Sequence, residues 1–130
     1  MFNSTISDGI TRIRNGYKAQ LMEIELCFSK LMVNFLEILK EEGYINGIEI
    51  FQEGNKKTIG VKLKYTRNRN ALREIHGISR PGQRIYAKHD KIPVLKNHFE
   101  LIILSTNQGL MTSHNARIRR VGGELLARVF

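Results

Sequence analysis

Residues 29–43, SKLMVNFLEILKEEG, constrain the fold more than any other segment, because they carry a complete set of helix signals. Ser29 is a residue type that caps helix N-termini, and Gly43 is the type that most often follows a helix C-terminus. Between them, four apolar side chains recur at helical spacing: Met32, Phe35, Leu36 and Leu39. We therefore expect an amphipathic helix over this segment.

The segments on either side of this helix alternate apolar and polar residues, which is the pattern of β-strands. EIELCF (23–28) precedes the helix, and YINGIEIF (44–51) and TIGVKLKY (58–65) follow it, joined by a polar turn. A second amphipathic helix is expected over residues 4–18, with its stripe formed by Ile6, Ile10, Ile13 and Tyr17. The first half is thus predicted to be an α-β-α-β-β unit.

The second half is richer in strand signals. TRNRNA (66–71) is polar, basic and unpatterned, and we interpret it as the boundary between an α/β lobe, residues 1–66, and a mostly β lobe, residues 67–130. The second lobe is predicted to contain a turn centred on Pro81-Gly82, strands at 84–88, 100–105 and 123–130, and a short helix from Thr112. The predicted fold class is α/β in the α+β sense, with an N-terminal α-β-α-β-β lobe packed on a mostly β C-terminal lobe.

Positive charge is concentrated in the second half. The chain has 21 Lys and Arg against 12 Asp and Glu, a net charge of +9. Residues 1–65 hold nine cationic and eight acidic side chains, whereas residues 66–130 hold twelve and four, and nine of those twelve cations are Arg. A nucleic acid, an anionic membrane or an acidic protein would fit such a charge. Since the guanidinium fork suits phosphate, we expect polyanion contact in the second half.

Signals for catalysis, metal binding and targeting are weak. Ser105 lacks the G-x-S-x-G elbow, and the four His have neither the i, i+4 spacing nor the cysteines of a metal site. The single cysteine, Cys27, lies in a predicted strand and is expected to be a buried structural thiol in a reducing compartment. No apolar run is long enough for a membrane span. We expect no enzyme, cofactor, metal, membrane partner or small-molecule substrate; an enzyme built around Cys27 is the weakest alternative.

LSTNQGLMTSHNAR (104–117) is the most unusual stretch, because two hydroxyls, two amides and a glycine directly follow an apolar run. Small hydrogen-bonding groups at the end of a buried strand suit the shallow minor groove of an RNA helix, where proteins read 2′-hydroxyls, base edges and shape. Arginines that follow at 117, 119 and 120 are placed to hold phosphates. The structural alternative is a strand-to-helix turn, with Gly109 at positive φ and Thr112 as the N-cap.

Two other basic segments are candidate RNA contacts. SRPGQRIY (79–86) interleaves Arg80 and Arg84 with Tyr86, a combination suited to phosphate contact and to packing on bases or sugars. TRIRNGYK (11–18) presents a basic helix face. Each has a simpler interpretation, as a solvated turn and a solvated helix face.

These segments together resemble a known family, that of the eighth protein of the bacterial-type small ribosomal subunit. Its signature is Ser-Thr-x-x-Gly-hydrophobic-Met-Thr with Ala and a basic residue shortly after, matched here by Ser105, Thr106, Gly109, Leu110, Met111, Thr112, Ala116 and Arg117. Similar segments occur in family order along the chain: TRIRN (11–15), SKL (29–31), EILKEEGYI (37–45), LKY (63–65), SRPGQRIY (79–86), IP (92–93) and VGGE (121–124).

The resemblance implies a two-lobed, non-enzymatic protein that binds the central domain of small-subunit rRNA directly, supports subunit assembly and meets neighbouring small-subunit proteins. It implies that the loop enters the RNA minor groove, with Glu124 and Thr112 supporting it. The RNA-binding residues expected in all are Ser105, Thr106, Asn107, Gln108, Gly109, Tyr86, Arg80, Arg84, Arg117, Arg119, Arg120, Thr11, Arg12, Arg14, Asn15, Ser29 and Lys30. A non-ribosomal RNA-binding or translational regulator module is the alternative function.

The chain departs from the family pattern around the loop. Gln108 stands where Lys is common, and the following helix opens Thr-Ser-His-Asn instead of Thr-Asp-Arg-Glu, so its capping box is incomplete. Arg119 and Arg120 add charge where many members are neutral. Sixteen Ile and ten Asn fit an AT-rich genome, which favours a ribosome of the mitochondrial matrix over one of a bacterial cytoplasm.

Overall fold

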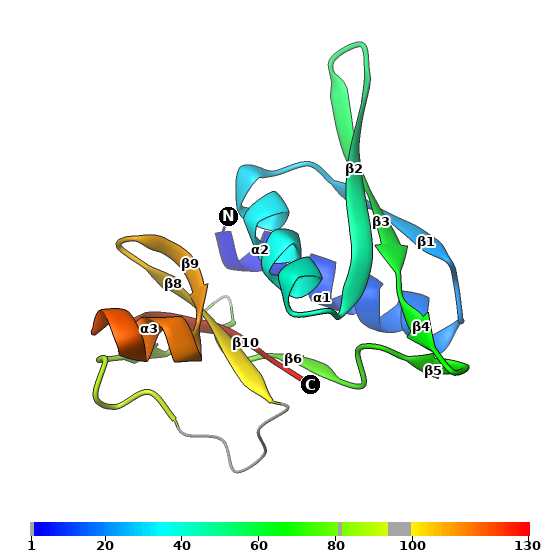
Figure 1. The fold of residues 1–130 in the computed structure, drawn as a ribbon. Helices are drawn as coiled ribbons and strands as arrows, with labels where there is room; N and C mark the ends of the chain where they lie inside the picture. The colour runs from blue at the N-terminus through cyan, green and yellow to red at the C-terminus, as the bar shows by residue number, and fades with distance from the viewer. Residues whose placement is uncertain (1, 81, 94–99) are drawn as a thin grey trace.

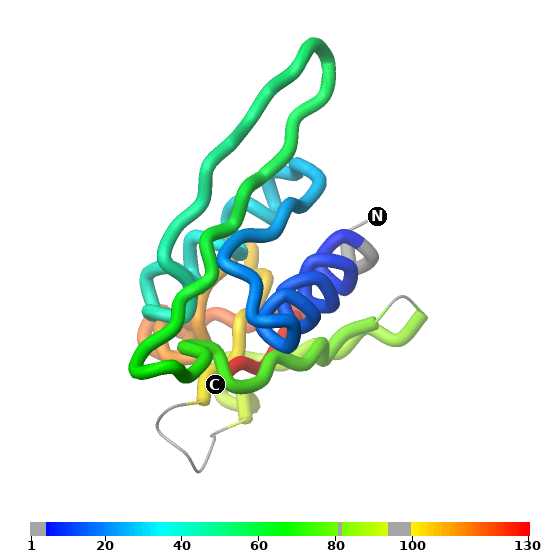
Figure 2. The backbone as a smooth tube through the Cα atoms, turned by 90° about the vertical axis from the view of Figure 1, so that its right-hand side faces the viewer, coloured from blue at the N-terminus to red at the C-terminus, as the bar shows by residue number. Residues whose placement is uncertain are grey.

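A computed structural model describes residues 2–80, 82–93 and 100–130. In the first half, helices α1 (Phe2–Lys18) and α2 (Lys30–Glu41) pack against one face of an antiparallel sheet. The sheet has the order β1-β3-β2, formed by Glu23–Cys27, Lys56–Leu63 and Ile45–Glu53. The β2–β3 hairpin continues well beyond the two helices, as Figures 1 and 2 show.

The helix signals of the first half are confirmed in detail. The Ser29 hydroxyl accepts a hydrogen bond from the Met32 amide at 3.0 Å, which satisfies one of the free N–H groups of the first turn of α2. Gly43 takes a φ of 84° just past the end of α2, a conformation that glycine adopts without a steric penalty. The predicted α-β-α-β-β order of the first half is present, and the ends of its helices and strands differ from the prediction by a few residues.

The second half forms a five-stranded sheet in the order β6-β10-β8-β9, with β7 also pairing with β10. Its strands are β6 (Ile75–Gly77), β7 (Tyr86–Ala87), β8 (Leu101–Thr106), β9 (Gly109–Thr112) and β10 (Gly123–Val129), and helix α3 (Ser113–Arg119) lies between β9 and β10 in the chain. Strand β9 was not predicted, and the strand expected at 84–88 is reduced to two residues. Pro81, half of the predicted turn, lies outside the described residues.

The segment expected to be an unpatterned linker is itself structured. β4 (Tyr65–Thr66) and β5 (Arg69–Asn70) form a small antiparallel hairpin. Its turn residues Arg67 and Asn68 both have positive φ, 53° and 65°, as a two-residue hairpin turn requires. A division of the chain at 66/67 stays a prediction.

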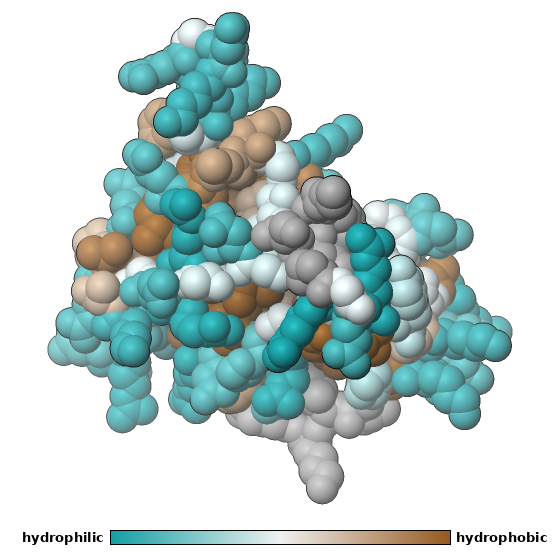
Figure 3. Space-filling model, turned by 180° about the vertical axis from the view of Figure 1, so that it is seen from behind, coloured by the Kyte–Doolittle hydropathy of each residue, from teal (hydrophilic) through white to brown (hydrophobic). Residues whose placement is uncertain are grey.

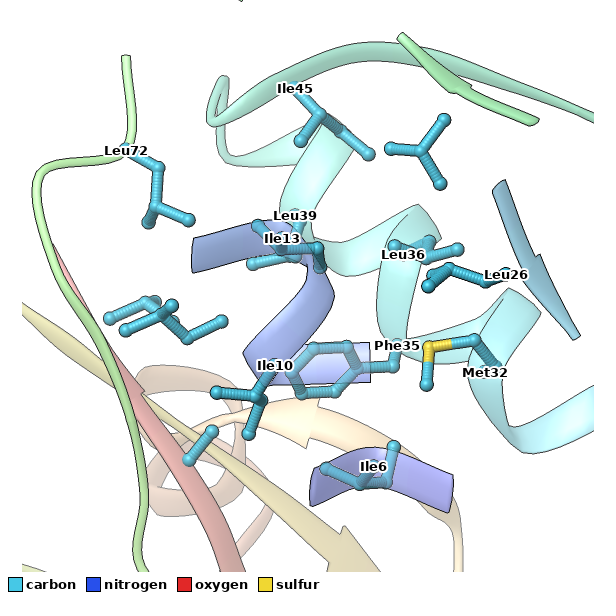
Figure 4. Packing of buried hydrophobic residues seen from close by; sticks show 14 of the residues in the cluster. Ile6, Ile10, Ile13, Leu26, Met32, Phe35, Leu36, Leu39, Ile45 and Leu72 are labelled. Carbon is cyan, nitrogen blue, oxygen red and sulfur yellow. The ribbon is translucent and has the colours of Figure 1, made fainter. Parts of the chain in front are cut away.

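The largest hydrophobic core includes residues from both halves of the sequence. Its buried members, many of them drawn in Figure 4, include Ile6, Ile10, Ile13, Phe35, Leu36, Leu72, Ile75, Ala127 and Val129. A second cluster lies on the side of α3 and contains Ile102, Leu104, Met111, Ala116 and Leu125. Because Arg14 also donates a 2.5 Å hydrogen bond to the Ile75 carbonyl, α1 is fixed directly to the C-terminal sheet.

The prediction that Cys27 is buried is wrong. Its side chain is exposed at the end of β1. Leu26 points into the core, and the alternation of the strand turns Cys27 to the opposite face, which the two helices do not cover. The apolar residues on either side of Cys27 therefore did not indicate its own burial.

Candidate nucleic-acid interface

The loop at 105–109 is a tight β-hairpin. Ser105 and Thr106 end β8, Asn107 and Gln108 form the turn, and Gly109 begins β9 with a φ of 107°. The Thr106 hydroxyl donates to the Gly109 carbonyl at 2.8 Å and accepts from the Gln108 amide at 3.1 Å. Both bonds lie within the turn, so the polar tip is held in one shape. The predicted strand-to-helix turn is replaced by this hairpin, although Thr112 does cap α3 by accepting from the Asn115 amide at 3.3 Å.

Three candidate residues from three strands lie side by side on one face of the sheet. In the strand register Ser105 pairs with Glu124, and Glu124 pairs with Tyr86. Residues directly opposite on neighbouring strands project from the same face. Glu124 is 5% exposed and Tyr86 is 66% exposed. A buried carboxylate is thus flanked by the loop hydroxyl on one side and by an accessible aromatic ring on the other.

A pair of glycines allows these strands to come together. A Cβ atom added to Gly123 would lie 2.0 Å from the Ser105 carbonyl oxygen, and one added to Gly122 would lie 2.3 Å from the Ala87 carbonyl oxygen. Both neighbours are backbone atoms, which cannot rotate away. The start of β10 can therefore lie between the loop strand and β7 only without side chains at these two positions.

The turn before β7 is also fixed by hydrogen bonds. The buried Ser79 hydroxyl accepts from the Ile85 amide at 3.0 Å, and the backbones of Arg80 and Gln83 exchange hydrogen bonds of 3.0 and 2.9 Å. Arg80 and Arg84 are exposed on this turn, and Arg84 Nε lies 3.9 Å from Glu124 Oε1. The predicted basic turn therefore reaches the carboxylate of the residue that pairs with Ser105 in the strand register.

The three arginines after the loop have different surroundings. Arg119 Nη1 donates to Gln108 Oε1 at 3.4 Å, so its cation lies beside the turn. Arg117 donates to the Pro93 carbonyl at 2.5 Å and is thereby held by the protein. Arg120 follows α3 with a left-handed φ of 56° and is exposed. Arg119 and Arg120 are thus the arginines of this segment that face outward.

A second basic surface lies where α1 meets β6. A hollow of about 830 Å³ is lined by Thr11, Arg14 and Arg80, together with His76. Exposed Asn15 is on the same helix, and Arg12 pairs with Asp8 at 3.1 Å. Of the two other candidates in the first half, Ser29 caps α2 and Lys30 is exposed in its first turn. The structure thus brings candidates from both halves of the sequence to one hollow.

Two further features bear on the kind of site. Within the described ranges, no group of three or more His, Cys, Asp or Glu side chains is placed to hold a metal ion. None of the described helices has the length and apolar character to cross a membrane.

Comparison with known proteins decides the family. A family model described as Ribosomal protein S8 matches residues 4–130. This chain belongs to the ribosomal protein S8 family. The predicted resemblance is confirmed, and because the family consists of structural ribosomal proteins, an enzyme built around Cys27 is excluded.

Bacterial members of the ribosomal protein S8 family align with this chain over nearly all of its length. Proteins named small ribosomal subunit protein uS8 are 44% identical over 128 residues in Mycoplasmoides gallisepticum, covering 96% of both chains, and 43% identical over 131 residues in Campylobacter hominis, covering 100% of both. The protein of that name from Rhodospirillum centenum is 43% identical over 127 residues, again 96% of both chains.

Sequence reasoning missed some residues that this S8-family site depends on. Gly122 and Gly123 are part of the family-like segment VGGE, and two adjacent glycines before a strand are in addition a signal of close backbone approach. His76, which lines the hollow beside α1, carried no signal in the sequence. The contact of Arg119 with Gln108 joins two positions eleven residues apart and depends on α3 folding back toward the turn.

Proposed function

We propose that this chain is a structural constituent of the small ribosomal subunit, binds the central domain of small-subunit rRNA directly and supports its assembly. Family membership and the names of the relatives support the first part. The observation that carries the second is the β8–β9 turn, in which small polar groups are fixed beside an exposed tyrosine. The partners are rRNA and neighbouring small-subunit proteins.

In this proposal the two kinds of residue have different tasks. Ser105, Thr106 and Asn107 enter the minor groove of an RNA helix and set the register, since their small side chains let the backbone approach sugars and base edges. Tyr86 packs against the RNA beside them. Arg80, Arg84, Arg117, Arg119 and Arg120 supply positive charge for the phosphates, which favours binding whatever the sequence.

The supporting residues keep the turn in position. Glu124 lies buried next to Ser105 in the register, and Thr112 fixes the start of α3. Gln108, where a lysine is common in the family, binds Arg119, so a cation remains at the turn. The Arg119 cation can therefore take the place of the lysine charge that is common at this position in the family.

The first half contributes a second contact surface. We infer that Thr11, Arg12, Arg14, Asn15, Ser29 and Lys30 meet other rRNA segments, while residues 67–130 bind the primary site. The hollow lined by Arg14 and Arg80 supports an RNA contact at α1, because it places cations around one accessible space.

Titration of the purified protein with RNA tests the proposal. A central-domain hairpin of small-subunit rRNA would be compared with a scrambled hairpin of equal length over a salt series. We expect tight binding that survives moderate salt and discriminates between the two RNAs. Equal and steeply salt-sensitive binding to both would mean that only the basic surface acts, which would contradict the assigned role of the turn.

Sedimentation distinguishes a ribosomal constituent from a regulator that uses the same surface. A constituent is recovered in particles the size of a small subunit, whereas a regulator stays in lighter fractions. The compartment is a separate inference: we place the protein in the mitochondrial matrix, on the abundance of Ile and Asn. Recovery of the particles from a cell without mitochondria would contradict it and support a bacterial cytoplasm.

A further inference from the structure

The projecting part of the β2–β3 hairpin has a surface unlike the rest of the molecule. Large apolar side chains are exposed there: Ile50 is 52% exposed, Phe51 45% and Phe28, at the adjoining end of β1, 36%. Figure 3 shows this apolar surface just below the hydrophilic tip of the hairpin. Exposed apolar residues that cluster on one element mark contact sites more often than isolated ones do. Here Ile50 and Phe51 lie on opposite faces of the hairpin that extends past the helices, and Phe28 follows the neighbouring strand β1.

Phe51 is positioned on the outer face of the sheet. In the register it stands opposite Thr58, whose other partner is Cys27. A Cβ atom added to neighbouring Gly60 would lie 2.7 Å from Phe51 Cε2, so one edge of the ring lies against this glycine. An aromatic ring already fixed on a surface loses little conformational entropy when a partner covers it.

The charge around Phe51 is opposite in sign to that of the whole chain. Alternation along the strands places four carboxylates and two ammonium groups on the outer face: Glu23, Glu25, Glu49, Glu53, Lys56 and Lys62. Lys62 binds Glu49 at 3.3 Å. A hollow of about 470 Å³ beside Phe51 is lined by Glu25, Glu53 and Lys56. The face therefore carries a net negative charge within a chain of +9.

The edge of the hairpin is open as well. Among the described residues, β2 hydrogen-bonds to β3 alone, so the outer edge of its projecting end presents free backbone donors and acceptors. An extended segment of another protein can pair with such an edge while its side chains contact both faces. Ile50 and Phe51 point to opposite faces and would both be covered.

We propose that the outer face and free edge of this hairpin bind a basic, extended segment of a neighbouring small-subunit protein, with Phe51 as the apolar anchor. The inference rests on the proposed ribosomal function. RNA does not fit, because its phosphates would lie against carboxylates. A second copy does not fit either, since a symmetric pair would bring the same carboxylates face to face. A basic segment matches both the charge and the apolar surface.

Cross-linking within assembled particles tests this proposal. The photoreactive residue p-benzoylphenylalanine would be introduced at position 51, with exposed Met22 as the matched control position, and the full chain assembled with rRNA and the other small-subunit proteins. We expect position 51 to cross-link to one basic protein and position 22 not to cross-link to that protein. Cross-links from position 51 to rRNA or to a second copy, or none, would overturn the proposal.

A double variant gives an independent measurement. Phe51→Ala with Glu53→Gln should lower recovery of that neighbouring protein in particles by about tenfold, as loss of an interface anchor commonly does, while Met22→Ala leaves it unchanged. Binding of the double variant to the rRNA hairpin should equal that of the parent. Unchanged recovery of every neighbouring protein would contradict the proposed hairpin contact and leave the proposed ribosomal function intact. Failure of the parent chain to bind rRNA or to enter particles would overturn the proposed function as well.

Discussion

The two long hairpins of this protein have similar turns and opposite surroundings. β2–β3 and β8–β9 are both antiparallel and both turn through two residues, Gly54-Asn55 and Asn107-Gln108. The β8–β9 turn is closed by the Thr106 hydroxyl, and its strands belong to a five-stranded sheet bordered by arginines. The β2–β3 hairpin extends beyond its helices (Figure 1). It carries carboxylates around the exposed Phe51 ring.

This difference shows that the setting of a hairpin decides what it can recognise. A turn embedded in a sheet keeps its hydrogen-bonding groups in fixed positions, which is what reading a rigid groove requires. A projecting hairpin with an open edge has fewer neighbours to fix it, but it can be covered from several sides by a flexible partner. Four variants test this contrast, beginning with the one that should have the largest effect.

Gly123→Ala should disrupt the embedded hairpin most severely. The new Cβ would lie 2.0 Å from the Ser105 carbonyl oxygen, so β10 and β8 must move apart. We expect the free energy of unfolding to fall by about 3 kcal/mol, as for severe overpacking. We also expect the variant to bind the rRNA hairpin and the scrambled RNA hairpin equally well. Urea denaturation measures the change in the free energy of unfolding. Gly47→Ala in β2 is the matched control, because an added Cβ would meet no atom within 4 Å beyond its chain neighbours. It should change stability by less than about 0.5 kcal/mol.

Removing the hydroxyls of the turn should affect recognition more than folding. Ser105→Ala with Thr106→Ala is expected to weaken binding to the specific RNA hairpin by about 2 kcal/mol, or about thirtyfold in Kd, because two hydrogen-bonding groups are lost. Thr58→Ala on the projecting hairpin should leave the Kd unchanged. Thr106→Ser keeps the hydroxyl that makes both turn hydrogen bonds and should retain the parental Kd. Parental affinity in the double variant would refute the role of the turn.

Tyr17→Phe should loosen the base of the projecting hairpin. The Tyr17 hydroxyl donates to the Tyr44 carbonyl at 2.5 Å, just before β2, and accepts from the Lys64 amide at 3.1 Å, just after β3. Loss of these bonds is expected to cost about 1 to 2 kcal/mol of stability at neutral pH. RNA binding should be unchanged once the protein is folded. A variant as stable as the parent would show that the base is held by packing alone.

The same substitution should also change how stability depends on pH. Burial raises the pKa of Tyr17 above 10.0, despite the opposing hydrogen bond from the Lys64 amide, because the phenolate loses hydration. Above pH 10.0 the unfolded chain releases this proton first, so the stabilisation is complete at lower pH and falls as pH rises through the raised pKa. Tyr17→Phe should reduce that fall in alkaline denaturation. Part of it should remain, since the pKa values of Tyr44 and Tyr65 are also raised by burial.

Removal of a single cation near each hairpin should have the smallest effect on RNA binding. Arg119→Ala is expected to weaken binding to all RNAs similarly, by about threefold, and to reduce the salt slope by about one unit or less. Lys57→Ala, which removes a cation lying 5.0 Å from the Phe28 ring centroid, should leave RNA binding unchanged. Equal losses in the two variants would mean that net charge alone governs affinity.

The extent to which the sequence predicted this structure differs between local and long-range features. Ser29, Gly43 and the apolar stripe between them act within a few residues, so the helix and its ends were predictable. β9 has only four residues, and β7 only two, so neither gives a readable alternation. The β4–β5 turn uses Arg67 and Asn68 at positive φ, where glycine would have been the usual signal.

The candidate site was predictable in composition but not in geometry. The run of small polar residues at 105–109 and the nearby arginines indicated RNA contact, and the resemblance added Tyr86 and Glu124. That Ser105, Glu124 and Tyr86 form one row follows from strand register, which no local pattern encodes. Likewise, the hollow shared by Arg14 and Arg80 depends on the packing of α1 against a strand more than sixty positions later in the sequence.

The main core has a consequence for how the protein is made. Ile6 and Ile10 of α1 pack in the same cluster as Ala127 and Val129 of β10. A ribosome synthesises a chain from its N-terminus and keeps the newest residues inside its exit tunnel, so this core closes only after position 129 has emerged. Until then the part of the core that β10 completes is open, and its apolar side chains are exposed to aggregation. A premature stop before β10 would therefore leave the main core incomplete and remove the strand that pairs with both β6 and β8.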